Sequence, residues 1–338
     1  MLIPPKYFLT SKISLLLSKI EAAKEVINSI SIPPEIEINI RRQSTLKSSL
    51  FSARIEGNPL TLEEVNHSPS KDQRKREVYN ILKALNLVYQ RGFKDLTDRL
   101  ILELHKIVLD QLTERDHLDK FRTESGAIFN AVGIAIYLSP PPRQIPLLMA
   151  RLTKFANSPK EQFIPIRACS AHYVFEKIHP FLDGNGRVGR LLIQAILTKG
   201  GYGMKGLLSL EEYLDNHRSE YYRSLEGTEK DVTDYLEFML EAINQTAQQT
   251  KELVLQKKQA KAEDYLLPRR AEILNIIKDQ KLVGFDVIRR RFMAVNERTL
   301  RYDLKQLQNQ GLIRKLGSTK GAYYEPIRNS TTSPSLII

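Results

Sequence analysis

The sequence predicts a mainly α-helical protein that ends in a small basic module. Over most of its 338 residues, apolar side chains recur at three- and four-residue spacing, which is typical of helices with one buried face. The interval Ile128–Leu138 differs, because it is apolar, contains Gly133 and runs into three prolines. We expect a short strand or a β-hairpin there. No internal repeat with a period of about 20–50 residues is present in the sequence.

The expected helices follow one another from the N-terminus. Tyr7–Ile30 ends at a pair of prolines, and Ile36–Ile55 is stopped by a glycine and a proline shortly after it. Thr61–Glu64 has the sequence of a capping box, which opens a further helix. Additional amphipathic helices are expected over Asp72–Gln90, Thr97–Gln111 and Pro146–Ala156, and Val188–Leu197 is sufficiently apolar to form a buried helix.

Composition narrows the class of protein. Apolar residues make up 42% and charged residues 27%, as in ordinary globular proteins. The net charge of +12 favours an anionic partner such as a nucleic acid, a nucleotide or a phosphorylated substrate. One cysteine, Cys169, excludes an internal disulfide framework and a cysteine-rich zinc site. No apolar stretch approaches the ~20 residues of a membrane span, and the N-terminus makes a poor signal peptide. We therefore expect a cytoplasmic protein without membrane contact.

The charge is distributed unevenly. Residues 264–328 carry 14 Lys or Arg against 7 Asp or Glu, so more than half of the surplus lies in this short stretch. Before it, Val232–Tyr265 contains no Gly or Pro and becomes polar after Gln245, which predicts one long helix whose second half leaves the core as a linker. The predicted segments are an N-terminal helical region (1–95), a core (96–232), a helical extension or linker (233–265), a C-terminal domain (266–328) and a flexible tail (329–338).

The stretch His179–Arg190 combines several chemical groups. Its glycine-rich turn leads into a helix, and such a helix start presents free backbone N–H groups to an anion. Arg187 and Arg190 share one helical face, and Asp183 is a hard oxygen ligand suited to Mg²⁺. His179 can exchange a proton near neutral pH. Together these groups are what a phosphate-transfer site requires.

The residues in His179–Arg190 allow two other interpretations, a dinucleotide-binding motif and a plain connecting turn. Gly184, Gly186 and Gly189 satisfy the dinucleotide-binding pattern, but that pattern needs a buried strand before the first glycine. The preceding residues include a proline and several polar groups, and the chain shows no alternation of strands and helices. A plain connecting turn would not need the arginines, the histidine and the aspartate that surround these glycines. The P-loop pattern is absent from the sequence.

The pattern His-x-Phe-x-Asp-Gly-Asn-Gly-Arg-x-x-Arg, which His179–Arg190 matches at every specified position, resembles the signature of Fic proteins. The likeness extends over roughly residues 35–260, and the apolar hairpin resembles the Fic flap. Most members of this family transfer AMP from Mg-ATP to a hydroxyl group of a target protein. The resemblance therefore implies a Fic-type helical core, ATP as the donor, Mg²⁺ as the metal, and a Ser, Thr or Tyr hydroxyl of another protein or of the chain itself as the acceptor.

The resemblance also assigns roles to residues of this chain. His179 would deprotonate the attacking hydroxyl, and Asp183 would hold Mg²⁺ between the α- and β-phosphates. The anion hole and the phosphate contacts would come from Gly184, Asn185, Gly186, Arg187, Val188, Gly189 and Arg190. The flap residues Ile134, Ala135, Ile136 and Tyr137 would cover the nucleotide and align the target segment by strand pairing. Tyr221 and Tyr222 match a position near the adenine, with core packing as the alternative.

The second helix carries a candidate switch. Ser52–Gly57 matches the family's inhibitory pattern [Ser/Thr]-x-x-x-Glu-[Gly/Asn]. Glu56 is expected at the negative end of the helix dipole, where a carboxylate is disfavoured by ~0.3–1 kcal/mol unless a cation compensates. The resemblance implies that this cation is Arg190 and that Glu56 occupies the space of the γ-phosphate. In some relatives the same glutamate helps to remove AMP. The alternative is a solvated glutamate at a helix end.

The basic module predicts three helices followed by a β-ribbon, which is the order of a winged helix. The helices are expected over Arg269–Asp279, Phe285–Phe292 and Glu297–Gln310, and the strands over Leu312–Lys315 and Ala322–Tyr324. The stretch around the third helix resembles the recognition helix of DeoR-like bacterial regulators. Candidate contacts to double-stranded DNA are Arg298, Thr299 and Arg301 for base edges and Arg314, Lys315 and Lys320 for phosphates. Docking of a protein is the alternative.

Three functions follow from the sequence. The first is a protein adenylyltransferase that Glu56 holds inactive. The second is a DNA-binding regulator that uses the Fic core as a nucleotide sensor, and the third is a Fic transferase with another donor, such as a different nucleotide or phosphocholine. A second copy of the chain is a further candidate partner, and the sequence leaves the oligomeric state open.

Overall fold

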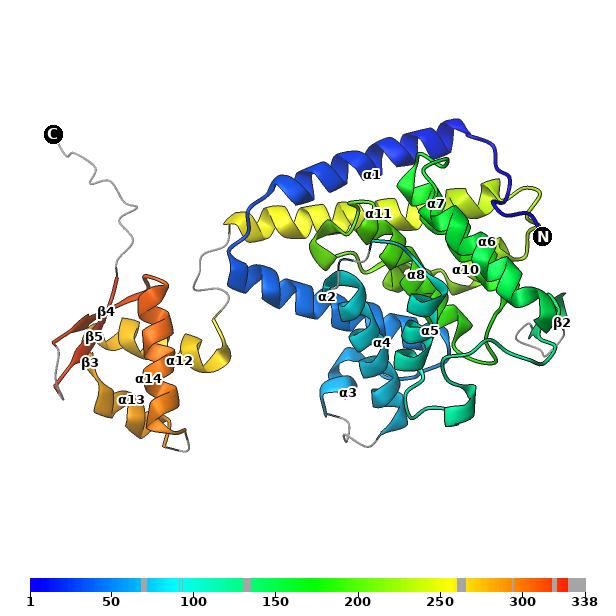
Figure 1. Ribbon diagram of the computed structural model, residues 1–338. Coiled ribbons are helices and arrows are strands. Elements are labelled where there is room, and N and C mark those ends of the chain that lie inside the picture. Colours follow the sequence, from blue (N-terminus) through cyan, green and yellow to red (C-terminus); the bar gives the residue numbers. More distant parts are fainter. Residues whose placement is uncertain are drawn as a thin grey trace, which may run out of the picture. The chain divides into compact units, whose positions relative to one another are not determined.

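The computed structural model describes residues 1–67, 72–90, 92, 94–129, 135–259, 266–293, 295–317 and 321–327. The chain divides into two compact units, Met1–Lys258 and Gln259–Ile338 (Figure 1). Both units are mainly helical, which confirms the predicted fold class. No helix in the described ranges is sufficiently long and apolar to span a lipid bilayer.

The first unit is a helical assembly with one small hairpin. Its longer helices are α1 (Ser11–Ser29), α2 (Pro34–Ile55), α4 (Gln73–Gln90), α5 (Asp98–Val108), α6 (Ile145–Asn157), α7 (Ile164–Ile178), α8 (Asn185–Lys199) and α11 (Thr233–Gln259). Shorter helices are α3 (Leu62–His67), α9 (Leu210–Asn216) and α10 (Arg218–Leu225). The strands β1 (Ala127–Phe129) and β2 (Ala135–Leu138) pair in antiparallel register, so the expected hairpin is present.

The centre of this unit is the pair α7 and α8. Nearly every residue of both helices is buried, and α6 packs on α7 while α2, α4 and α5 pack around α8. Because α7 is buried on nearly all sides, with His172, Glu176 and Lys177 buried among its apolar residues, it has no exposed polar face and the amphipathic pattern did not predict it. The turn between the two helices buries Pro180, Phe181 and Gly184 and leaves Leu182 and Asp183 exposed.

Local caps set the ends of several helices. The side chains of Thr10 and Thr97 accept hydrogen bonds from the first turns of α1 and α5. The capping box at Thr61 is confirmed, because Thr61 N donates to Glu64 Oε2 at 2.8 Å and Glu64 N donates to Thr61 Oγ1 at 3.3 Å. These side chains satisfy N–H groups that the helices leave free.

Helix α11 departs from the prediction in its second half. Ala247, Thr250 and Val254 are buried, and the Thr250 hydroxyl donates to the carbonyl of Leu207 at 3.4 Å. The polar residues around them occupy the other face of the same helix. The expectation that this half leaves the core is therefore wrong as far as Val254, because a polar composition conceals a narrow apolar stripe.

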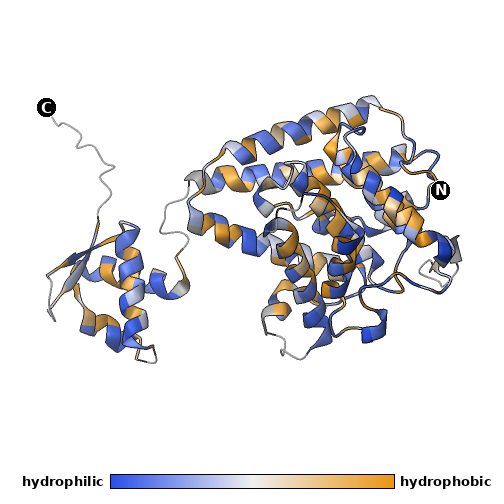
Figure 2. Ribbon diagram, viewed as in Figure 1, coloured by the Kyte–Doolittle hydropathy of each residue, from blue (hydrophilic) through white to orange (hydrophobic). Residues whose placement is uncertain are grey.

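The second unit has its own hydrophobic core. Its elements are α12 (Pro268–Gln280), β3 (Val283–Gly284), α13 (Phe285–Arg291), α14 (Glu297–Asn309), β4 (Ile313–Leu316) and β5 (Tyr323–Pro326). The strands form an antiparallel sheet in the order β3-β5-β4. The three helices and the β4-β5 hairpin occur in the predicted order, whereas β3 is too short for a sequence pattern. The buried residues of this core come from all three helices and the sheet, and Figure 2 shows the apolar and polar faces along the helices.

Candidate functional site

The turn between α7 and α8 is built on a left-handed residue. His179 caps α7 with φ 49° and ψ 61°, and its N–H donates to the carbonyl of Phe175 at 2.9 Å. This conformation is uncommon for any residue other than glycine. It ends α7 and turns the chain into the five residues that lead to α8. Burial lowers the pKa of the His179 imidazole, so the ring is neutral and able to accept a proton near neutral pH.

Asn185 and His105 fix this turn from both sides. The Asn185 side chain accepts from Phe181 N at 2.9 Å and donates to Phe181 O at 2.8 Å. The His105 ring stacks on Phe181 with 3.8 Å between ring centroids, and its Nε2 lies 3.1 Å from the carbonyl oxygen of Asp183. Burial lowers the pKa of His105 to about 4, so the neutral ring donates its Nε2–H to that carbonyl. The turn is therefore held rigidly in front of α8.

Helix α8 presents its first turn at the end of this loop. Gly184 has φ 83° and is the N-cap, and Val188 N donates back to its carbonyl at 3.0 Å. The N–H groups of the first helical turn have no partner within their own helix. One expected donor is already used, because Gly184 N donates to Asp183 Oδ1 at 2.5 Å. The remaining N–H groups of this turn provide an anion site.

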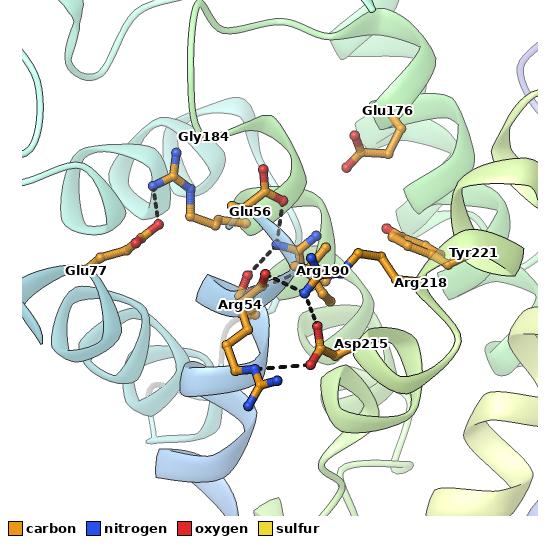
Figure 3. Close-up of polar contacts among 12 residues, drawn as sticks. Arg54, Glu56, Glu77, Glu176, Gly184, Arg190, Asp215, Arg218 and Tyr221 are labelled. Carbon is orange, nitrogen blue, oxygen red and sulfur yellow. Dashed lines mark hydrogen bonds and ion pairs between the residues drawn. The ribbon is translucent and has the colours of Figure 1, made fainter. Parts of the chain in front are cut away.

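Glu56, at the C-terminal end of α2, contacts the second arginine of the motif (Figure 3). Arg190 is only 1% exposed, and its NH2 donates to Glu56 Oε1 at 2.8 Å. The same guanidinium donates to the hydroxyl and the carbonyl oxygen of Ser52 at 3.0 and 2.9 Å. Burial alone would lower the pKa of Arg190, but the Glu56 carboxylate outweighs it and holds that pKa above the ordinary value.

Gly186 brings the Glu56 carboxylate onto the start of α8. A Cβ atom placed on Gly186 would lie 2.4 Å from Glu56 Oε1, so any side chain at this position would force the carboxylate to move. The carboxylate thus lies at the negative end of α2 but at the positive end of α8, next to Arg190. Arg190 and α8 compensate the charge that the end of α2 disfavours, and Glu56 covers the anion site.

The first arginine of the motif, Arg187, forms an ion pair with a carboxylate that the sequence analysis did not single out. Arg187 NH1 donates to Glu77 Oε1 on α4 at 2.7 Å, and its NH2 donates to Asp183 Oδ1 at 2.6 Å. The other oxygen of Glu77 accepts from the side chain of Asn58 at 2.8 Å. Both arginines of the motif are therefore paired with acids, and Glu77 ties Arg187 to the turn that follows α2.

Asp183 is the candidate metal ligand. Its side chain is 62% exposed. No cluster of three or more His, Cys, Asp or Glu side chains within the described ranges is arranged to hold a metal ion. A single exposed carboxylate beside an anion site nevertheless suits Mg²⁺, which commonly takes one or two carboxylates and completes its shell with phosphates and water.

The two tyrosines differ in their surroundings. Tyr221 is 1% exposed, and its hydroxyl lies 3.0 Å from His172 Nε2, so its ring packs in the core. This corrects the expectation that Tyr221 offers a face to the adenine, because burial leaves no face open. Tyr222 is exposed and donates to the carbonyl of Ile55 at 3.2 Å. Tyr222 therefore lies beside the end of α2.

Gly189 approaches a buried acid that the sequence did not single out. A Cβ atom on Gly189 would lie 2.1 Å from Glu176 Oε1. Burial raises the pKa of Glu176 to about 8, and burial lowers the pKa of the neighbouring His172 to about 3. Both side chains are thus favoured in their neutral forms behind α8. Glycine at 189 permits the close packing of α7 and α8 at this point.

The expected flap residues lie in or next to β2. Ile134 lies outside the described residues, and Ala135, Ile136 and Tyr137 belong to the strand. The Lys177 ammonium lies 4.5 Å from the centroid of the Tyr137 ring. Because Lys177 belongs to the last turn of α7, this contact brings β2 next to the helix that ends at His179.

The candidate DNA-binding residues of the second unit are partly engaged. Arg298 and Thr299 lie in the first turn of α14, whereas the Arg301 guanidinium stacks 3.9 Å above the Phe285 ring. Arg314 on β4 donates to Glu325 at 2.6 Å. Lys315 pairs in register with Tyr324, and Lys320 lies outside the described residues. Arg301 and Arg314 are therefore less free than the sequence suggested.

Comparison with known proteins gives a family match for the central region. Residues 95–197 match the Fic/DOC family. The chain is 26% identical over 244 residues to the "Protein adenylyltransferase Fic" of Drosophila melanogaster and to that of Drosophila persimilis, covering 68% of this chain. It spans only 47% and 45% of the lengths of these curated relatives.

Solved structures share the fold. A Fic family protein from Desulfovibrio desulfuricans G20 superposes with a TM-score of 0.68 at 23% identity, over 97% of this chain and 99% of that protein. Fic-1 from C. elegans superposes with a TM-score of 0.60 at 20% identity, over 72% of this chain and 73% of the other. At these identities the likeness is evidence for the fold alone.

Proposed function

We propose that this chain, whose residues 95–197 form a Fic/DOC family domain, is a protein adenylyltransferase in its inhibited state. It transfers AMP from ATP to a Ser, Thr or Tyr hydroxyl of a target protein or of the chain itself. The observation that carries the proposal is the position of Glu56, whose carboxylate bonds Arg190 and touches Gly186. An acid in this place occupies the anion site that the donor phosphates need.

The residues of the turn support each part of this reaction. The neutral His179 takes the proton of the attacking hydroxyl, whose oxygen forms a bond to the α-phosphorus while the bond to pyrophosphate breaks. The first-turn N–H groups of α8, with Arg187 and Arg190, bind the phosphates. Asp183 would hold Mg²⁺, which neutralises phosphate charge when bound. The name of the Drosophila relatives supports AMP as the transferred group.

Inhibition follows from competition for the same partners. Glu56, whose side chain is partly exposed, holds the buried Arg190 through a charge-assisted hydrogen bond, which is stronger than a bond between neutral groups. The γ-phosphate of ATP requires that partner as well, so ATP binds in a geometry unfit for transfer while Glu56 remains. We propose further that this carboxylate orients a water molecule that attacks the phosphorus of a modified target, so that the hydroxyl is restored and AMP leaves; this hydrolysis is a second reaction to test.

The intact mass of the protein after incubation with Mg-ATP tests the proposal. Glu56→Gly should gain the mass of AMP at least tenfold faster than the wild type, because Arg190 loses its carboxylate partner and the start of α8 is uncovered. His179→Ala in the Glu56→Gly background should gain nothing yet still bind ATP. Glu25→Gly, which removes an exposed glutamate on α1, is the control and should behave like the wild type.

An outside target requires a second arm of the same experiment. If the intact mass does not change, the protein is incubated with a cell lysate and labelled ATP, and transfer of the label to a lysate protein is measured. The same assay with other nucleotides or with CDP-choline in place of ATP tests the alternative donors. If Glu56→Gly binds ATP normally and labels neither itself nor any lysate protein with any donor, the transferase proposal is wrong.

A second candidate function is binding of double-stranded DNA by the C-terminal unit, which we propose to be a winged helix. The observation that favours it is the exposed face of α14, where Arg298, Tyr302 and Lys305 follow one another at helical spacing. Basic side chains near the start of such a helix reach base edges, and the others reach phosphates.

Fluorescence anisotropy with labelled duplex DNA tests this second candidate. Binding should weaken as salt rises, and the double substitution Arg298→Ala and Lys305→Ala should weaken it about tenfold or more at low salt. The control is the double substitution Lys278→Ala and Lys281→Ala, which removes the same charge from the end of α12. Equal binding by both double variants, or no binding at low salt, would favour protein docking.

A further inference from the structure

Arg122 is a buried cation in the segment that leads from α5 to β1. It is 4% exposed, and no carboxylate within the described ranges forms an ion pair with it. All the hydrogen bonds found for its guanidinium go to backbone carbonyl oxygens. Nε donates to His179 at 2.7 Å, NH1 to Glu124 at 2.6 Å, and NH2 to Pro140 at 2.7 Å and more weakly to Ile178 at 3.4 Å.

This arrangement is energetically unusual. A buried charge is costly unless hydrogen bonds satisfy it, and burial indeed lowers the pKa of Arg122. Carbonyl dipoles from four residues replace water around the guanidinium, and those of Ile178 and His179 lie at the negative C-terminal end of α7, where a cation is favoured. An apolar side chain would leave these carbonyls without donors. One guanidinium therefore donates to the end of α7, to the segment before β1 and to the segment after β2.

Gly126 shows how closely the surroundings enclose the guanidinium. A Cβ atom on Gly126 would lie 3.1 Å from Arg122 Nε and 3.2 Å from its Cζ. The backbone at 126 thus packs directly against the plane of the guanidinium. Gly126 also pairs with the far side of the hairpin, because its carbonyl accepts from Ser139 N at 3.1 Å.

The partners of Arg122 belong to two functional parts. The first part is the backbone around the proposed base, where the Arg122 side chain donates to Ile178 and His179. The Arg122 N–H also donates to the carbonyl of Pro180 at 2.8 Å. Glu124 and Pro140 flank the open end of the β1-β2 hairpin, where Ala127 pairs with Leu138. One side chain consequently connects the base to the hairpin.

We infer that Arg122 is a positioning residue for the transfer reaction. The inference rests on the proposed function, in which His179 is the base and the hairpin pairs with the target segment. Through its planar guanidinium, Arg122 hydrogen-bonds both the left-handed backbone of His179 and the two ends of the hairpin, and so holds them in a fixed relative position. It thereby sets the position of the target hydroxyl relative to the base, and the reaction requires that geometry to be accurate to fractions of an ångström.

Steady-state kinetics in the Glu56→Gly background test this inference. Arg122→Lys should lower kcat at least tenfold, because an ammonium cannot replace the planar fork of donors. The KM for ATP and its Kd by calorimetry should stay within about twofold, since the phosphate partners lie on α8. Arg143→Lys, the same change at an exposed arginine after the hairpin, should leave kcat unchanged.

Chemical rescue separates positioning from general damage. Arg122→Ala leaves a space shaped for a guanidinium, so millimolar guanidinium should restore part of kcat, whereas it should restore nothing in His179→Ala. If Arg122→Ala does not fold, Gly126→Ala presses on the retained guanidinium and should lower kcat with the ATP Kd unchanged. Unchanged kcat in Arg122→Lys, or a loss of ATP binding as large as the loss of kcat, overturns the inference. An inactive Glu56→Gly parent that binds ATP instead overturns the proposed function.

Discussion

At the scale of single residues, two glycines of the motif lie so close to a carboxylate that a side chain at either position would collide with it. Gly186 leaves room for Glu56, and Gly189 leaves room for Glu176. A methyl group at either position would meet an oxygen at 2.4 or 2.1 Å, which is far inside van der Waals contact. The glycines therefore serve the packing of acids around α8 as well as the access of an anion to its first turn.

The ionisation of His179 gives a prediction for the pH dependence. Burial lowers the pKa of this imidazole, so protonation begins only below the ordinary value of about 6.5. The neutral ring is the form that accepts a proton, and kcat of Glu56→Gly should therefore remain high below pH 6.5 and fall only at lower pH. A pH profile of self-modification measures this. A midpoint at or above 6.5 would contradict it.

The residues of the motif and Glu56 could be predicted because each belongs to a short contiguous pattern. Their supports could not be predicted in the same way. Glu77 meets Arg187 across 110 positions of the chain, and Arg122 acts on His179 across 57. Within the part of the chain that the structure describes, the Arg122 side chain moreover donates hydrogen bonds only to backbone oxygens. Every residue type provides such an oxygen, so no partner residue marks Arg122 in the sequence. Tyr221 was ambiguous because an aromatic ring suits both a core and a base.

At the scale of elements, the end of α2 is fastened by side chains from α9 and α10. Arg218 donates to the carbonyl of Arg54 at 2.6 Å, and both arginines pair with Asp215, whose side chain is 4% exposed (Figure 3). The Arg54 carbonyl also accepts from Gly57 N at 2.9 Å, so Arg218 adds a side-chain donor from another helix two residues before Glu56. This contact holds the end of α2, and with it the inhibitory carboxylate, against α9 and α10.

Loosening this fastening should activate the protein without a change at Glu56. Asp215→Asn removes the charge that holds Arg54 and Arg218, so the end of α2 should move more freely and release Arg190 more often. We expect self-modification by Mg-ATP to rise several-fold, less than in Glu56→Gly. Glu220→Gln, which changes an exposed acid on α10, is the control. A rate equal to that of the wild type, with Glu56→Gly active, would show that α2 holds Glu56 without Asp215.

Some of the helices and strands could be predicted from the sequence and others could not, and the difference has a physical cause. Helices with one buried face, such as α1 and α4, show the periodic pattern that reveals them. Helix α7 is buried all round, and the two-residue strand β3 gains its identity only by pairing with β5. The hairpin was recognised because its apolar run ends in prolines, which a helix would not tolerate in its interior.

At the scale of the whole molecule, the two units have separate cores and separate charge. The second unit buries residues of α12, α13, α14 and its sheet around one centre. Much of the basic surplus of the sequence lies in this unit. The salt-dependent part of any DNA binding should therefore disappear when the chain ends at residue 259, while self-modification of Glu56→Gly should persist in the shortened chain.

The contact between Glu56 and Gly186 restricts how activity can arise by mutation. Substitutions on the α2 side can withdraw the carboxylate and leave the anion site intact. Any side chain at position 186 would also expel Glu56, but it would fill the same space and block the phosphates. A genetic screen for unregulated activity should consequently return changes in α2 and its fastening on α9 and α10, and none at Gly186.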